Sequence, residues 1–182
     1  MRFLIVSFIF IVQISFIHSQ IQYNWQNSTE GWVSGGNCNL TAQPDAMAMR
    51  LFSSNAVMRS GNLQSNLGIN GGDYNQVQVM IKNPTTGSSM ARLFLYPPGT
   101  NTAACYYAFQ VDTAMSGFST YTISLDSLPT GGSSTPYTGP IARFGLRAPW
   151  GGVNFDTIYW KQMIITNTNQ VIDSANITFK VD

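Results

Sequence analysis

The sequence predicts an all-β fold, a single antiparallel β-sandwich or jelly roll of about eight short strands. Short runs of β-branched and aromatic residues recur along the chain, and Gly, Pro, Ser and Asn separate them. No apolar stripe of helical period extends over about ten residues. The length of 182 residues suits one domain, and the composition does not shift along it.

Each expected strand has its own residue pattern. Val77, Val79 and Ile81 alternate with polar residues over 76–82, so their side chains share one face of a strand. The other expected strands, in chain order, are 22–25, 46–51, 92–96, 105–111, 118–125, 141–148 and 155–165. The loop 69–73 contains two glycines, which permit positive φ before the next strand. Residues 171–181 alternate weakly and are expected to form a last strand or an ordered tail.

The first 19 residues have the pattern of a cleaved secretory signal. Arg2 gives a positive start, an apolar run extends from Phe3 to Ile17, and the small residue Ser19 ends it. No later segment approaches 18 uninterrupted apolar residues. We therefore predict a signal peptide at 1–19, one domain at 20–182, and a secreted product located outside the cell or at its surface, with no membrane span after cleavage.

Composition excludes several classes of function. Charged residues make up 9% of the chain against about 25% in typical proteins, which argues against a basic face for nucleic acid. Cleavage after Ser19 removes the single histidine, His18, so nucleophilic triads and imidazole-ligated metal centres are excluded. The carboxylates are scattered singly, without the pair that a glycosidase needs. We expect no enzyme.

A secreted chain can carry two covalent modifications, a disulfide and N-linked glycans. Cys38 and Cys105 are predicted to form a disulfide in an oxidising compartment, with two free buried thiols as the alternative. Sequons begin at Asn27, Asn39 and Asn176, and they predict N-glycosylation of an exposed glycoprotein.

Four pieces of the chain carry a family resemblance. Asn24-Trp25 with Ser28-Thr29-Glu30-Gly31-Trp32 is the first, and Asp73 to Asn83, Ala91 to Leu95 and Phe155 to Ile158 follow. In this order they resemble the strands of galactose-binding-like jelly rolls, the fold of many carbohydrate-binding modules. The resemblance implies a glycan or polysaccharide partner. The chain departs from the family pattern at Leu95, where related modules often have tryptophan, and at Ala148, where they often have an acid.

Sugar recognition needs aromatic faces and planar hydrogen-bonding groups. In 141–148, Arg143 and Arg147 alternate with apolar residues and should share one face of a strand. The candidate ligand-binding residues are Arg92, Tyr96, Tyr106, Gln110, Tyr137, Arg143, Arg147 and Trp150. The alternative for the arginines and tyrosines is solvent-facing cover of a sheet, and Trp150 in its Pro-Trp-Gly-Gly loop either stacks on ligand or packs in the core. Trp25 and Trp32 are expected to pack in the core or at a sheet edge.

The resemblance also implies a structural calcium ion, with Glu30 and Asp156 in the matching motif regions. The alternative is that these carboxylates accept local backbone hydrogen bonds. We therefore predict a secreted, non-catalytic carbohydrate-binding domain. The alternative function is a structural subunit of an extracellular coat, matrix or appendage, which assembles with itself or with other extracellular glycoproteins.

Overall fold

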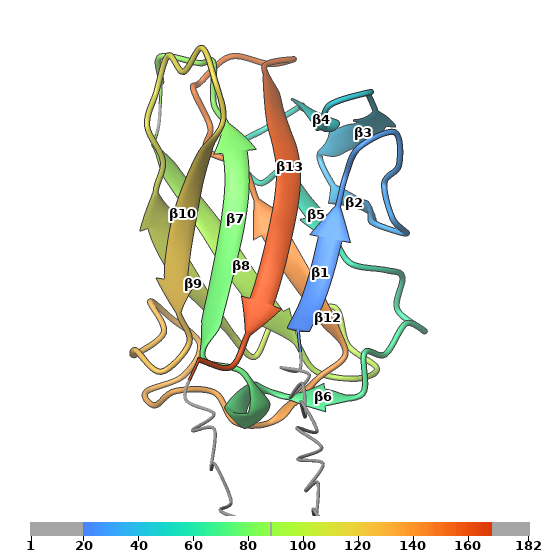
Figure 1. The fold of residues 1–182 in the computed structure, drawn as a ribbon, viewed down its shortest axis with the longest axis vertical. Coiled ribbons are helices and arrows are strands. Elements are labelled where there is room, and N and C mark those ends of the chain that lie inside the picture. The colour runs from blue at the N-terminus through green and yellow to red at the C-terminus, as the bar shows by residue number, and fades with distance from the viewer. Residues whose placement is uncertain (1–19, 88, 169–182) are drawn as a thin grey trace, which may run out of the picture.

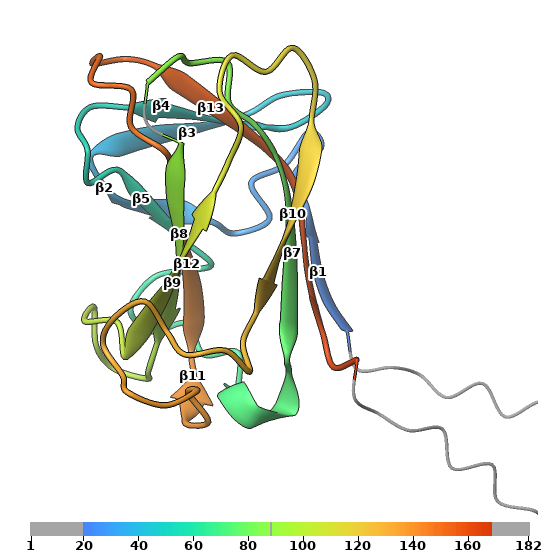
Figure 2. The same ribbon diagram turned by 90° about the vertical axis from the view of Figure 1, so that its left-hand side faces the viewer.

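Two antiparallel sheets packed face to face form the fold (Figure 1, Figure 2). The computed structural model describes residues 20–87 and 89–168. The predicted signal peptide at 1–19, the sequon at Asn176 and the weakly alternating segment 171–181 lie outside these residues. No helix in this part of the chain is long and apolar enough to cross a membrane.

The first sheet, sheet A, is built around a long central strand. In spatial order it contains β10 (Ser119–Ser124), β7 (Gln76–Lys82), β13 (Thr157–Thr166), β4 (Met47–Leu51) and β3 (Cys38–Ala42). β1 (Gln20–Asn24) pairs with the second half of β13, beyond the half that pairs with β4.

The second sheet, sheet B, carries the candidate site. Its spatial order is β2 (Val33–Gly36), β5 (Val57–Arg59), β12 (Arg143–Arg147), β8 (Met90–Tyr96) and β9 (Cys105–Gln110). A small pair, β6 (Ile69–Asn70) and β11 (Pro140–Ile141), lies at one end of the sandwich next to a single 3-10 turn, η1 (Gly71–Asp73).

The core lies between the two sheets and comes from one face of each strand. Val77, Val79 and Ile81 of β7 are fully buried, as their alternation predicts. Trp25 and Trp32 are also buried, and their rings meet edge to face with centroids 5.0 Å apart. These contacts confirm the all-β sandwich and the core position predicted for both tryptophans.

The predicted disulfide is wrong in this structure, because Cys38 and Cys105 are both buried free thiols. The Cys38 thiol donates to the backbone carbonyl of Val57 on β5, at 3.3 Å. Cys105 lies on β9, three strands from β5 across sheet B. Neighbouring strands are about 4.8 Å apart, so the two sulfurs are far beyond bonding distance. The alternative of two buried thiols is the one observed.

The loop at 69–73 also differs from expectation. Its glycines do not have positive φ. Gly71 is needed for a close approach instead, since an added Cβ would lie 2.0 Å from the carbonyl oxygen of Tyr137.

Candidate functional site

The outer face of sheet B gathers arginine and aromatic side chains. Successive residues of a strand point to opposite faces. On β8, Leu93 and Leu95 therefore enter the core, whereas Arg92, Phe94 and Tyr96 point outward. The same alternation on β5, β9 and β12 completes a set that we call the arginine–tyrosine face: Arg59, Arg92, Phe94, Tyr96, Tyr106, Arg143 and Arg147.

Tyr96 is the centre of one half of this face. It pairs with Arg143 across β8 and β12, and its ring lies over Gly145, where there is no side chain. The guanidinium carbons of Arg59 and Arg143 lie 5.0 and 5.3 Å from the centre of the Tyr96 ring. Both contacts fall in the range of cation–π attraction.

The Arg143 side chain is fixed by hydrogen bonds and does not reach solvent. Only 1% of its surface is exposed, because it donates hydrogen bonds to Oδ1 of Asn101, at 3.1 Å, and to the carbonyl of Thr100 in the loop after β8. Burial, and then the charge of Arg59, lower the pKa of Arg143 from its ordinary value. A guanidinium nevertheless stays protonated in proteins. Arg143 is therefore a fixed positive charge beneath the surface.

Arg92 and Arg147 form the more open half of the face. They lie opposite each other on β8 and β12, and both are half-buried. The Arg92 guanidinium lies over Tyr106, with its carbon 4.7 Å from the ring centre. Burial and the neighbouring charge of Arg92 lower the pKa of Arg147, and Tyr106 acts in the opposite direction.

A cavity of about 250 Å³ opens beside this arginine pair. Its lining consists of Ser54, Met90, Arg92, Arg147, Ala148 and Trp150. Trp150 is half-buried in the loop that follows β12, and it packs partly against the core. The cavity therefore combines one aromatic side chain with two guanidinium groups, which are the two kinds of group that sugar recognition needs.

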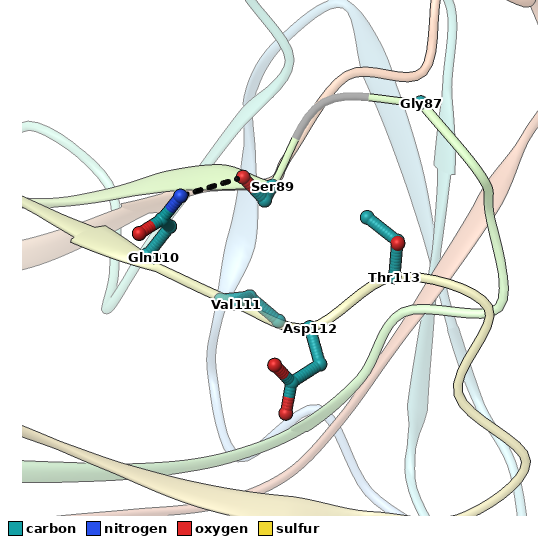
Figure 3. Close-up of a pocket in the computed structure, with 6 residues that line it drawn as sticks. All are labelled: Gly87, Ser89, Gln110, Val111, Asp112 and Thr113. Carbon is teal, nitrogen blue, oxygen red and sulfur yellow. Dashed lines mark hydrogen bonds between the residues drawn. The ribbon is translucent and has the colours of Figure 1, made fainter.

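A larger cavity of about 460 Å³ lies between the start of β8 and the end of β9 (Figure 3). Gly87, Ser89, Gln110, Val111, Asp112 and Thr113 line it. Gln110 donates a hydrogen bond from Nε2 to Oγ of Ser89 at 3.4 Å. No aromatic side chain lines this cavity, so it offers hydrogen bonds but no stacking surface for a sugar ring. We therefore centre the candidate site on Trp150.

The predicted site residues separate into four groups. Arg92, Arg147 and Trp150 line the smaller cavity, with Tyr106 against Arg92, and Gln110 lines the larger cavity. Tyr96 and Arg143 share the same face but are 4% and 1% exposed, which leaves them too buried to contact a ligand directly. Tyr137 lies elsewhere, over Gly71, and its hydroxyl donates to the carbonyl of Pro140 at 3.0 Å.

Sequence reasoning missed Arg59 and Phe94. Phe94 is half-buried between the rings of Tyr96 and Tyr106, with centroids 6.1 and 5.6 Å away. Its place between Arg92 and Tyr96 in a strictly alternating strand was a usable signal. Arg59 lies on a strand of only three residues, which is too short to show a periodic pattern.

The two carboxylates predicted to bind calcium do not lie together. Glu30 accepts a hydrogen bond from the backbone N–H of Asn24 at 2.6 Å, and Asn24 pairs with Gln162. Asp156 precedes β13 and its carbonyl accepts from the N–H of Leu51. Glu30 therefore lies near Gln162, six residues along the chain from Asp156, which is a distance of about 20 Å in an extended strand. Ligands of one calcium ion lie within about 5 Å of each other.

Calcium binding at either carboxylate alone stays a prediction. Within residues 20–87 and 89–168 no three or more His, Cys, Asp or Glu side chains gather as a metal site. Asn27 and Asn39 are exposed, so the glycosylation predicted there also stays a prediction.

Comparisons with known proteins identify the architecture. No family model and no curated protein sequence matches the chain. Among solved structures, the xylan-binding module CBM15 is 16% identical with a TM-score of 0.51, covering 85% of this chain and 99% of that one. The xylan-binding module CBM86 of Roseburia intestinalis is 13% identical with a TM-score of 0.50, covering 80% and 93%.

An arabinose-bound α-L-arabinofuranosidase also matches, at 13% identity and a TM-score of 0.55. The match covers 79% of this chain but only 25% of the enzyme. The chain thus has the jelly-roll fold of carbohydrate-binding modules. Because fold alone does not establish function, the function must be argued from the Trp150 cavity.

Proposed function

We propose that this chain is a secreted, non-catalytic glycan-binding domain whose ligand stacks on Trp150 and hydrogen-bonds to Arg92 and Arg147. The observation that carries the proposal is the cavity itself, which joins one aromatic ring and two guanidiniums on the outer face of a sheet. Arginine presents its N–H donors in one plane, which suits the hydroxyl rim of a sugar.

Two further observations support this function. Two of the solved structures that match over most of both chains are xylan-binding modules, so β-linked polysaccharides are the first ligand class to test. The carboxylates are scattered singly along the sequence, whereas a glycosidase needs two of them across the scissile bond. The proposal therefore assigns binding without hydrolysis.

A glycan array with the secreted protein tests the proposal. Trp150→Ala should weaken binding about tenfold or more, as truncation of a central aromatic anchor does. Tyr159→Ala is the matched control, because Tyr159 is a half-buried aromatic on β13 of sheet A with the Lys82 ammonium 5.4 Å from its ring centre.

Since Trp150 also packs against the core, Arg147→Gln serves as a second variant, and urea unfolding checks that each protein is folded. Binding that disappears in the two site variants and persists in the control supports the site. Equal binding by all four proteins would reject it.

The alternative function, a structural assembly subunit, is favoured by one feature. The loop between β12 and β13 exposes Val153 and Phe155, at 59% and 57%, and such a tip suits contact with another protein. Size-exclusion chromatography across a range of concentrations tests this alternative. A mass that rises with concentration in a protein that binds no glycan would favour assembly over the proposal.

A further inference from the structure

The arginine–tyrosine face is positively charged without a matching negative charge. Its arginines, Arg59, Arg92, Arg143 and Arg147, are four of the nine basic residues in a chain of net charge +1. None of the five strands of sheet B, all of which the structure describes, contains Asp or Glu. The electrostatic potential at this face is therefore positive, although the net charge of the whole chain is near zero.

The charges on this face have different roles. Arg143 is buried and bonded to Asn101 and Thr100, so it supplies a fixed background charge. Arg59 lies against Tyr96, and its Nε is buried without a hydrogen-bond partner. Arg92 and Arg147 line the cavity, and they are the charges that a bound molecule meets.

Arg92 and Arg147 repel each other across the strands. Directly opposite residues on antiparallel strands have Cα atoms about 5 Å apart, and like charges there destabilise the sheet. Burial and the charge of Arg92 lower the pKa of Arg147, and no Asp or Glu of the described residues is among the groups that affect it. An anion between Arg92 and Arg147 would gain attraction from both guanidiniums.

The geometry leaves hydrogen-bond donors free for such an anion. The guanidinium carbon of Arg92 lies 4.7 Å from the centre of the Tyr106 ring, in the range of cation–π attraction. A cation–π contact uses no hydrogen bond, so the N–H groups of the guanidinium remain available to a ligand. Paired in-plane N–H groups match the oxygens of a carboxylate or a sulfate.

We propose that the ligand of the Trp150 cavity is an acidic glycan, whose carboxylate or sulfate ester binds between Arg92 and Arg147. This inference rests on the proposed glycan binding and adds the chemical class of the ligand. The shared chemistry is an oxyanion on a sugar ring. The ring stacks on Trp150 while the oxyanion lies over the arginine pair.

The experiment compares matched polymers by isothermal titration calorimetry. Polygalacturonate is tested against its carboxyl-reduced form, a sulfated galactan against its desulfated form, and xylan serves as a neutral polymer. The two charged polymers distinguish a carboxylate from a sulfate ester. The expected result is that at least one charged polymer binds tenfold or more tightly than its neutral form, and that added salt weakens the binding.

Variants separate a site from general charge attraction. Arg92→Gln and Arg147→Gln should each weaken binding of the charged polymer about tenfold, the loss expected for a charged hydrogen bond. Arg50→Gln is the control, because it removes the same charge from an exposed arginine on β4 that also lies over an aromatic ring, that of Phe155. Arg50→Gln should bind almost as tightly as the unaltered chain.

The outcomes distinguish this inference from the proposed function. Equal affinity for charged and neutral forms, with binding still lost in Trp150→Ala, would overturn the acidic ligand and leave glycan binding intact. Equal losses in Arg50→Gln and Arg147→Gln would also overturn it, because general charge would then explain the preference. Absence of binding to every polymer would reject both proposals.

Discussion

Gly145 lies beneath the ring of Tyr96, and a methyl group added at this position should disturb the arginine–tyrosine face. A Cβ at residue 145 would lie 2.6 Å from Cε2 of Tyr96 and 3.3 Å from the carbonyl oxygen of Met58. Carbon atoms in favourable contact are about 3.5–4.0 Å apart. The Tyr96 ring must therefore move by roughly 1 Å in Gly145→Ala.

The cost follows from how firmly Tyr96 is held. Its side chain is 4% exposed and has a guanidinium against its ring from both Arg59 and Arg143. Overpacking at a site of this kind lowers the free energy of unfolding by about 1–3 kcal/mol. In a protein of this size each kcal/mol changes Tm by about 2–4 °C, so Tm should fall by about 2–12 °C.

Thermal unfolding followed by tryptophan fluorescence measures this change. Gly117→Ala is the matched control, because an added Cβ there meets nothing within 4 Å and the residue does not have positive φ. The control should leave Tm unchanged or raise it slightly, because alanine restricts the unfolded chain. Equal Tm values for Gly145→Ala and Gly117→Ala would show that the added methyl group does not clash with Tyr96.

A second variant isolates the contact itself. Tyr96→Leu removes the ring, so adding Gly145→Ala to it should cost less than about 0.5 kcal/mol. An undiminished cost in the double variant would show that the methyl group clashes with something other than Tyr96.

Three further predictions concern stability. Asn83 is fully buried, and its side-chain amide donates to the carbonyl of Asp112 at 3.1 Å and accepts from the Thr85 hydroxyl at 2.7 Å. Asn83→Ala should therefore lower the free energy of unfolding, measured in urea, by about 1–3 kcal/mol. Cys38 and Cys105 should react with a thiol reagent only after unfolding, without prior reduction, and a failure to detect two thiols in urea would contradict the free pair. Burial raises the pKa of Cys105 from 9.0 to about 11. Because the thiol of the unfolded chain loses its proton at lower pH than the thiol of the folded chain, the free energy of unfolding should fall as pH rises from about 9 to about 11. Cys105→Ala should flatten that decline.

Local patterns were sufficient to predict most of the sheets. Alternation in 76–82 and 141–148 identified which side chains enter the core, and burial of Val77, Phe144 and Leu146 confirms both patterns. Four short strands, β2, β3, β5 and β6, were missed. β2 is Gly-rich, and β5 and β6 have three and two residues, so these segments have no measurable period.

Long-range packing explains what the sequence could not predict about the site. Arg143 and Arg147 are indistinguishable in a strand pattern, since both point to the outer face. Arg143 is nevertheless covered by the loop that carries Thr100 and Asn101, whereas Arg147 stays open. The disulfide prediction failed for a related reason. Two cysteines in a secreted chain indicate an oxidising compartment, but they do not show how far apart the cysteines lie across a sheet.

Binding of a glycan at the Trp150 cavity, on the outer face of sheet B, can be observed by NMR. An oligosaccharide that the protein binds is added stepwise to isotope-labelled protein, and the chemical shifts are followed. We expect the NMR signals of the indole N–H of Trp150 and of the guanidinium N–H groups of Arg92 and Arg147 to shift, while the Lys161 and Tyr159 signals of sheet A stay in place. Shifts confined to Ser89, Asp112 and Thr113 at the larger cavity, with Trp150 unmoved, would contradict binding at the Trp150 cavity.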